Sequence, residues 1–298
     1  MARILNFGSL NIDYVYGVSH MVRPGETLAA RGRAVHPGGK GLNQSVALAR
    51  AGARVWHAGL VGPEGDVLLG VCREAGVDTT FVGRTETPSG HTVIQVDDTG
   101  QNSILLFGGA NREVDEAFAD EVLSHFGPGD YLVLQNEISC LGHIVERGCE
   151  RGLTIVLNPS PYDEALDGVD LGKVSLFFVN EIEGAQMTGG STDPDEILDR
   201  MAERYPAAQV VLTLGSSGSV YQAAGGARRV RQGAYAVDAV DTTGAGDTFT
   251  GYFVAAVSAG ADVAAALDLA ARASAIAVTR AGAVPSIPTA EEVASFFA

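Results

Sequence analysis

The chain has 298 residues, 46% of them hydrophobic, and a formal net charge of −16 from 20 basic and 36 acidic side chains. This length is sufficient for one large α/β domain with a sizeable core. The acidic excess argues against extended electrostatic contacts with nucleic acid or an anionic membrane, so neither is predicted as a partner.

The sequence shows no pattern typical of secretion or membrane insertion. The strand-like segment 4–7 lacks a preceding basic region, hydrophobic block and cleavage site, which predicts a cytoplasmic protein. The most apolar region, 253–278, is interrupted by Asp262, Asp268 and Arg272, so it is not predicted to span a bilayer. The three cysteines form no CxxC pair, which indicates reduced thiols rather than disulfides or a zinc site.

Short apolar segments rich in β-branched residues alternate with helical patterns along the chain. The predicted strands are residues 4–7, 55–60, 131–134, 154–157, 176–179 and 209–214. The predicted helices include residues 43–51, 66–75 and 194–205. This alternation predicts an α/β fold: a three-layer, doubly wound, mainly parallel sheet with helices on both faces. Ligands of such sheets bind beyond the carboxyl ends of the strands.

Two segments, 12–36 and 90–108, interrupt the alternation. In the second, "HTVIQVDD" and "NSILLFGG" flank a turn at residues 98–100, which predicts a β-hairpin. We expect both segments to form a small second sheet, a lid on a single domain of residues 1–298. Because the hairpin has apolar residues on both faces, one face is predicted to cover a ligand and the other to contact a second subunit, giving a homodimer.

The segment "PGGKGLNQSVALARAG", residues 37–52, combines a glycine-rich turn with the start of a helix. It is not a P-loop, because Gly41 rather than Ser or Thr follows Lys40, and no GxGxxG follows the first strand. The turn predicts backbone amides close to a small polyol, with Asn43 as both donor and acceptor. Lys40 is one of only two lysines. Arginine-rich codon usage is one explanation of that scarcity. The other is that this position requires the compact ammonium group of lysine, which the planar guanidinium group of arginine cannot replace.

Polar residues follow four of the predicted strands. These segments are "NID" (11–13), "QNEI" (135–138), "NEIE" (180–183) and "TLGSSG" (213–218). Each alone is also explained as an ordinary loop, because these residue types prefer loops. Their shared position at carboxyl ends predicts a common ligand site.

The segment "DTTGAGDTFTGYF", residues 241–253, leads into a helix predicted to run from about Thr248 to Ala259, with Asp247 at its N-cap. Capping alone is one explanation of Asp247. The sequence Gly244-Ala245-Gly246 favours another, because successive backbone N–H groups at a helix N-terminus form an anion site. An anion site beside a carboxylate suits phosphoryl transfer to a hydroxyl group.

The two glycine-rich segments resemble the two signatures of the ribokinase-like carbohydrate kinases. "PGGKGLNQSVALARAGARVWHAGLVGPEGD" is similar to the first and "DTTGAGDTFTGYF" to the second, and the resemblance runs in order over essentially the whole chain. Within the family, "GGKGLNQ", "GAN", "NPSP" and "TRAGAVPSIP" resemble most the ribokinases, which phosphorylate ribose.

The resemblance implies a role for each matching residue. Asp247 would deprotonate the sugar's primary hydroxyl, and the amides of Gly244, Ala245 and Gly246 would form the anion hole. The implied sugar-binding residues are Asn11, Asp13, Gly39, Lys40, Asn43, Glu137 and Asp241. Asn180 and Glu183 would arrange the phosphates and Mg²⁺, and the nucleotide site would include Thr213, Gly215, Ser216 and Gly218. The implied monovalent-cation residues, for K⁺, are Asp241, Thr243, Ala277, Arg280, Gly282 and Ser286. Ala271 stands where some members place a histidine near the adenine.

The expected function is therefore an ATP-dependent kinase that converts D-ribose to ribose 5-phosphate, with Mg²⁺ and K⁺. A kinase for fructose or a nucleoside of the adenosine or inosine type is the first alternative. A non-catalytic sugar-binding protein of the same fold is the second, and the intact Asp247 and glycine turn argue against it.

Overall fold

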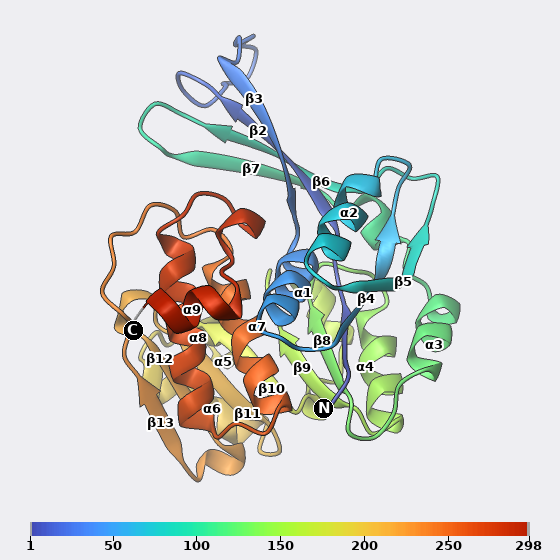
Figure 1. The fold of residues 1–298 in the computed structure, drawn as a ribbon, viewed down its shortest axis with the longest axis vertical. Helices are drawn as coiled ribbons and strands as arrows, with labels where there is room; N and C mark the ends of the chain where they lie inside the picture. The colour runs from blue at the N-terminus through green and yellow to red at the C-terminus, as the bar shows by residue number, and fades with distance from the viewer. Residues whose placement is uncertain (1, 297–298) are drawn as a thin grey trace.

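A nine-stranded sheet lies at the centre of the computed structural model, which describes residues 2–296 (Figure 1). In sheet order the strands are β13 (Arg229–Gln232), β12 (Ser219–Gln222), β11 (Gln209–Thr213), β10 (Leu176–Asn180), β9 (Thr154–Asn158), β8 (Tyr131–Gln135), β1 (Ile4–Phe7), β4 (Val55–Val61) and β5 (Asp78–Arg84). From β11 to β5 every neighbouring pair is parallel, and β12 and β13 are antiparallel additions.

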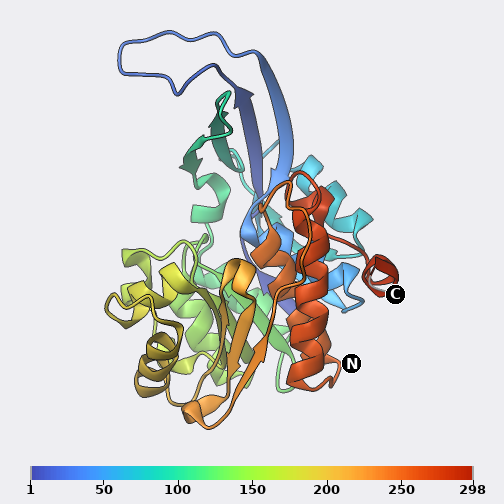
Figure 2. The same cartoon turned by 90° about the vertical axis from the view of Figure 1, so that its left-hand side faces the viewer.

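Helices cover both faces of this sheet and create two separate cores. The helices are α1 (Lys40–Arg50), α2 (Asp66–Glu74), α3 (Glu116–Ser124), α4 (Leu141–Glu150), α5 (Glu181–Thr188), α6 (Pro194–Arg204), α7 (Ala245–Ser258), α8 (Val263–Val278) and α9 (Ala290–Phe296). Successive strand residues point to opposite faces, so Ile4 packs with α1, α2, α7, α8 and α9. Leu5 belongs to the other core, which includes residues of α3, α4, α5 and α6. Helices lie on both sides of the sheet in Figure 2. The predicted three-layer fold is confirmed.

The parallel register brings the carboxyl ends of the strands to one edge. Gln135 at the end of β8 lies opposite Asn158 at the end of β9, and Asn180 of β10 lies opposite Thr213 of β11. The polar segments that follow these strands are therefore neighbours in space, as the sequence predicted.

The two interrupting segments form a second, four-stranded sheet with the order β3 (Gly32–Gly38), β2 (Asn11–Gly17), β6 (Gly90–Val96) and β7 (Asn102–Phe107). Strands β6 and β7 form the predicted hairpin, and the β2–β6 pair is parallel. The small sheet projects from the body beyond the carboxyl ends of the central strands (Figure 1). Asn11 and Asp13 lie within β2 rather than in a loop, so the lid itself carries them.

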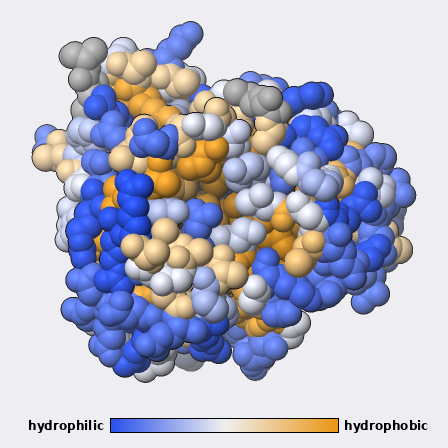
Figure 3. Space-filling view, turned by 90° about the horizontal axis from the view of Figure 1, so that it is seen from below, coloured by the Kyte–Doolittle hydropathy of each residue, from blue (hydrophilic) through white to orange (hydrophobic). Residues whose placement is uncertain are grey.

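Three further features agree with the composition. The three cysteines are free. Within residues 2–296 no helix is both long and apolar enough to cross a bilayer. Seen from below, hydrophilic residues surround the face and apolar residues gather toward its middle (Figure 3).

Candidate active site

Asp247 lies in a cavity of about 250 Å³ at the carboxyl edge of the central sheet. The cavity is lined by Lys40, Asn158, Phe178, Val179, Asn180, Glu183, Thr213, Thr242, Gly244, Gly246, Asp247 and Thr250. The Asp247 side chain is 7% exposed. It does not face bulk solvent, so it meets a first requirement for a catalytic base.

The predicted N-cap position of Asp247 is wrong. Helix α7 begins at Ala245, its N-cap is Gly244, and Asp247 lies inside the first turn. Gly244 adopts φ 75°, a left-handed conformation that glycine reaches without strain, so the helix begins directly after it. The carboxylate still lies at the positive end of the helix dipole.

Two of the three amides proposed for the anion hole are unengaged. Among the described residues, the N–H groups of Gly244 and Gly246 donate to no protein acceptor, whereas that of Ala245 donates to the carbonyl of Thr242 at 3.2 Å. An anion at this helix N-terminus would therefore meet the free amides of Gly244 and Gly246 first.

Helix α1 supplies a hydrogen-bond donor to each carboxylate oxygen of Asp247. Asn43 Nδ2 donates to Oδ2 at 3.0 Å, and Gln44 Nε2 donates to Oδ1 at 2.9 Å. Sequence reasoning selected Asn43 and missed Gln44. The signal was present as the residue that follows Asn43 in "GLNQ", but only the helix placement shows that both amides reach Asp247.

The glycines before α1 permit this placement because the helix start lies against the β1–β2 connection. A Cβ atom on Gly41 would lie 2.3 Å from the backbone nitrogen of Ser9, and one on Gly39 would lie 3.1 Å from that of Asn11. Gly39 also has φ 92°. Any larger residue at Gly41 would move α1, and with it Asn43, away from Asp247.

Lys40 is the half-buried cation of the site. Burial lowers the pKa of its ammonium group, but the nearby charges of Asp247, Glu137 and Glu183 outweigh burial and raise the pKa above its ordinary value. Lys40 is therefore charged at neutral pH and faces three carboxylates. It provides the local positive charge that a phosphorylated ligand needs in this acidic protein.

Several predicted sugar-binding residues interlock at the junction of body and lid. Glu137 accepts hydrogen bonds from the Ser9 hydroxyl and from the Lys40 backbone amide, the latter at 2.9 Å. Asn11 Oδ1 accepts from Asn111 Nδ2 at 2.7 Å, and Asp13 accepts from Thr92 at 2.5 Å. Burial raises the pKa of Asp13 and of Glu137 above the ordinary carboxyl range, against the lowering effect of these donors.

Asp241 does not join this set. Its Oδ1 accepts from the backbone amide and hydroxyl of Thr243, and its Oδ2 accepts from the amide of Gly282 at 2.8 Å. Burial raises the pKa of Asp241, but these donors outweigh burial and hold it below the ordinary value. Because both oxygens are directed to the turn at 241–243 and to the loop at Gly282, Asp241 lies with the predicted cation residues.

Three of the predicted cation residues have backbone carbonyl oxygens that are unpaired among the described residues. Within residues 2–296 the carbonyl oxygens of Thr243, Arg280 and Gly282 accept no hydrogen bond, and the charged Asp241 lies among them. The carbonyl of Ala277 instead accepts from the Arg280 amide at 3.0 Å, and the Ser286 hydroxyl donates to Ala283 at 2.7 Å. Unpaired carbonyl oxygens beside a carboxylate are the hard ligands that alkali and alkaline-earth cations prefer.

A second, larger cavity of about 530 Å³ adjoins the first. The predicted nucleotide residues Thr213, Gly215, Ser216 and Gly218 line it, together with Ala271. Both cavities include Thr213, Thr242 and Gly246 in their walls. A ligand in the larger cavity can therefore reach toward Asp247 past the free amide of Gly246.

Asn180 and Glu183 form the capping box of α5. Asn180 Oδ1 accepts from the Glu183 amide at 2.9 Å, and Glu183 Oε2 accepts from the Asn180 amide at 3.1 Å. Both residues also line the cavity around Asp247. No cluster of three metal-ligating side chains occurs among residues 2–296. Glu183 is a carboxylate of the kind that holds Mg²⁺ together with phosphates and water.

Comparison with known proteins places this site in a family. Residues 1–290 match the pfkB family carbohydrate kinases. The chain belongs to this family. It is therefore a carbohydrate kinase, a phosphotransferase whose acceptor is a sugar alcohol group.

The similarity of this kinase to its relatives extends over nearly the whole chain. It is 33% identical to a ribokinase of Haemophilus influenzae over 97% of this chain and 96% of the relative. It is 32% identical to a deoxyribokinase of Salmonella typhimurium over 96% of this chain and 95% of the relative. The structure of Arabidopsis thaliana ribokinase complexed with ribose and ATP matches with a TM-score of 0.87 and 28% identity, over 98% of this chain and 97% of that chain.

Proposed function

We propose that this kinase transfers the γ-phosphate of ATP to the primary hydroxyl of D-ribose, giving ribose 5-phosphate. The observation that carries the proposal is the junction of two cavities at Gly246, with Asp247 on one side and the predicted nucleotide residues on the other. The ribokinase of Arabidopsis thaliana, which matches along the chain, is solved with ribose and ATP.

Asp247 is proposed to accept the proton of the sugar hydroxyl as its oxygen attacks the γ-phosphorus. The bond from that phosphorus to the bridging oxygen breaks, and ADP leaves. Asn43 and Gln44 hold the carboxylate, the charged Lys40 and the free amides of Gly244 and Gly246 meet the phosphoryl charge, and the lid excludes water. When bound, Mg²⁺ near Asn180 and Glu183 would neutralise phosphate charge, and K⁺ in the loop at Gly282 would add positive charge beside the anion hole.

The buried polar groups of the site favour a polyol as acceptor. The side-chain oxygen Oδ1 of Asn43 is buried and has no hydrogen-bond partner among the described residues. It can therefore accept a hydrogen bond from a sugar hydroxyl. Asp13 and Glu137 offer further acceptors. A sugar that lacks one matching hydroxyl would leave a buried group unpaired, at a cost of about 1–3 kcal/mol.

2-Deoxyribose is a second candidate acceptor, because the deoxyribokinase relative is nearly as similar as the ribokinases. A substrate panel decides between them. ADP release with ATP and Mg²⁺ would be measured for D-ribose, 2-deoxyribose, fructose, adenosine and inosine. We expect the highest kcat/KM for D-ribose. A higher value for any other compound would overturn the choice of ribose, and ADP release with none would favour a sugar-binding protein without activity.

A further inference from the structure

A buried chain of side-chain amides links Asp247 to the interior of the central sheet. Gln44, which donates to Asp247, accepts at its Oε1 from Gln135 Nε2 at 2.7 Å. The same Gln135 nitrogen donates to Asn6 Oδ1 at 3.0 Å, and Asn6 Nδ2 donates to the backbone carbonyl of Gly41 at 2.7 Å. Asn6, Gln44 and Gln135 are all 0% exposed.

The chain has only one possible polarity. A backbone carbonyl can only accept, so Gly41 requires the nitrogen of Asn6 to face it. Asn6 then presents its oxygen to Gln135, Gln135 presents its nitrogen to Gln44, and Gln44 has only its nitrogen left for Asp247. A reversal of any amide would oppose two acceptors in a buried site, which is costly.

A branch of the network supports the same orientation. Asn6 Nδ2 also donates to Ser45 Oγ at 2.7 Å, and Ser45 Oγ lies 2.7 Å from His57 Nδ1. His57 Nε2 faces the carbonyl of Gly8 at 3.2 Å, so it carries the proton and Ser45 donates to Nδ1. Ser45 Oγ is thereby left as an acceptor for Asn6.

The position of Gln135 also depends on a small neighbour. A Cβ atom on Gly8 would lie 2.2 Å from Gln135 Oε1. Glycine at position 8 therefore leaves the space that the Gln135 side chain occupies. Gln135 Oε1 itself has no hydrogen-bond partner within the described residues.

We propose that Gln44 is a positioning residue for Asp247, and that Gln135 and Asn6 act through it by fixing which end of its amide faces the carboxylate. The inference rests on the proposed role of Asp247 as the base. The donated hydrogen bond fixes the plane of the carboxylate, so that a free lone pair faces the substrate hydroxyl.

The charged groups that face Asp247 come from three elements. They are Lys40 of α1, Glu137 after β8 and Glu183 of α5. A substitution at Gln44 or Gln135 changes none of these charged groups. A shift in the pH profile of kcat would therefore result from loss of the amide hydrogen bond.

The test compares Gln44→Met and Gln135→Met by the pH dependence of kcat for D-ribose. For Gln44→Met we expect kcat to fall about 10- to 100-fold with KM for the sugar nearly unchanged, as for a misplaced catalytic group. The acid limb of kcat should move to higher pH, because the carboxylate loses a hydrogen-bond donor. Gln135→Met should act in the same direction to a smaller extent.

A double-mutant cycle separates positioning from general damage. If Gln135 acts through Gln44, adding Gln135→Met to Gln44→Met changes neither kcat nor the acid limb further. Gln222→Met is the matched control, because Gln222 is an equally buried glutamine that donates to the Leu198 carbonyl at 2.6 Å, remote from Asp247 in the hydrogen-bond network. It should lower the melting temperature and leave the acid limb in place.

The outcomes distinguish the two proposals. If Asp247→Asn retains kcat within about tenfold, Asp247 is not the base and the proposed mechanism fails. Suppose instead that Asp247→Asn loses activity. An acid limb that is unmoved in Gln44→Met and Gln135→Met would then overturn only the positioning role. The same conclusion would follow if the losses of kcat in the two single variants multiplied in the double variant. If Gln44→Met does not fold, the acid limb of Gln135→Met, whose side chain does not touch the carboxylate, decides the same question.

Discussion

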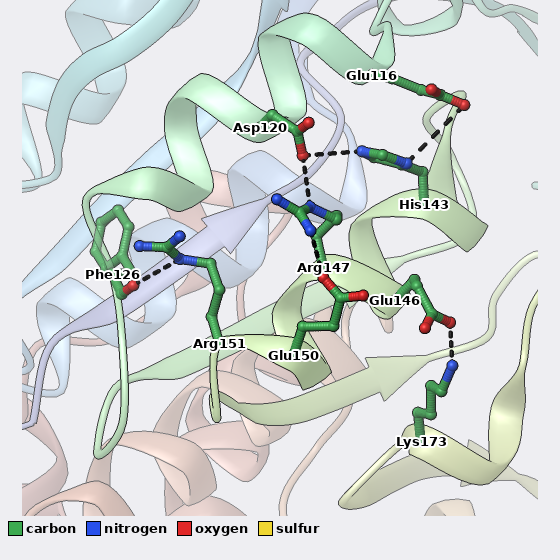
Figure 4. Close-up of polar contacts among 9 residues, drawn as sticks. All are labelled: Glu116, Asp120, Phe126, His143, Glu146, Arg147, Glu150, Arg151 and Lys173. Carbon is green, nitrogen blue, oxygen red and sulfur yellow. Dashed lines mark hydrogen bonds and ion pairs between the residues drawn. The ribbon is translucent and has the colours of Figure 1, made fainter.

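At the scale of single residues, the two lysines occupy contrasting environments. Lys173 pairs with Glu146 at the surface near α4, beside the contacts of Asp120 with His143 and Arg147 that connect α3 to α4 (Figure 4). Such exposed ion pairs contribute little to stability. Lys40, like Lys173, is half-buried, but it lies among three carboxylates of the site. The two lysines therefore differ in their partners rather than in their exposure, because Lys40 faces carboxylates beside the cavity around Asp247.

Asp247→Asn tests the base directly. The substitution keeps the size of the side chain and removes its ability to accept a proton, so kcat should fall about 10²- to 10⁴-fold. Sugar binding, measured by calorimetry, should persist. Loss of sugar binding together with kcat would instead indicate a structural role.

His57 predicts a pH dependence of stability. Burial lowers the pKa of His57 to about 4, from an ordinary value near 6.5. Below pH 6.5 the unfolded chain binds a proton that the folded chain excludes, so the free energy of unfolding falls as the pH falls. From pH 7 to pH 5 this group alone should remove about 2 kcal/mol.

Urea unfolding of the wild type and of His57→Gln at both pH values measures this effect. The difference in unfolding free energy between the two proteins should shrink toward pH 5. A constant difference would contradict the neutral, buried state of His57.

At the scale of elements, the loop after α8 and the turn before α7 act as one unit because Asp241 joins them through Gly282. Arg50 at the end of α1 donates to the Val284 carbonyl at 3.0 Å, and Tyr252 of α7 donates to that of Pro288 at 2.7 Å. The loop is thus held against the two helices that carry Asn43 and Asp247.

Replacing Na⁺ by K⁺ at constant ionic strength should raise kcat, because the unpaired carbonyl oxygens of this loop suit a large monovalent cation. Initial rates in the two chloride salts, with tetramethylammonium chloride as a control for ionic strength, measure the effect. Asp241→Asn should reduce the response. Equal rates in all three salts would count against a cation site here.

At the scale of the whole molecule, the lid exposes an apolar surface that the body does not cover. Strand β7 carries Ile104, Leu105, Leu106 and Phe107, which are 57%, 71%, 44% and 48% exposed. Four consecutive exposed apolar residues occupy both faces of the strand. A homodimer through the lid remains our prediction, since one face can cover the sugar while the other meets a second subunit.

Leu105→Glu should convert a dimer to a monomer in sedimentation velocity, because it places a charge in the predicted apolar interface. Val67→Glu is the control, since Val67 is 49% exposed on α2, a helix of the body rather than a strand of the small sheet. A monomeric wild-type protein, or a Leu105→Glu variant that stays dimeric, would contradict the predicted interface.

The sequence by itself determined the strand and helix alternation, the hairpin and the two glycine-rich segments. These features depend on local periodicity and backbone freedom, which a short window of residues contains. The antiparallel edge strands β12 and β13 were not predicted, because an edge strand depends on pairing with its neighbour rather than on a distinctive local pattern.

Only the tertiary structure decided which polar residues meet. Gln44 and Asp247 are 203 positions apart, and Asn6 and Gln135 are 129 apart. Their contacts result from how α1 and α7 pack over the parallel strands. The sequence assigned Asp241 to both the sugar set and the cation set, and the same packing directs its oxygens to Thr243 and Gly282. Local pattern fixes an element, whereas the direction of a buried amide depends on every partner that surrounds it.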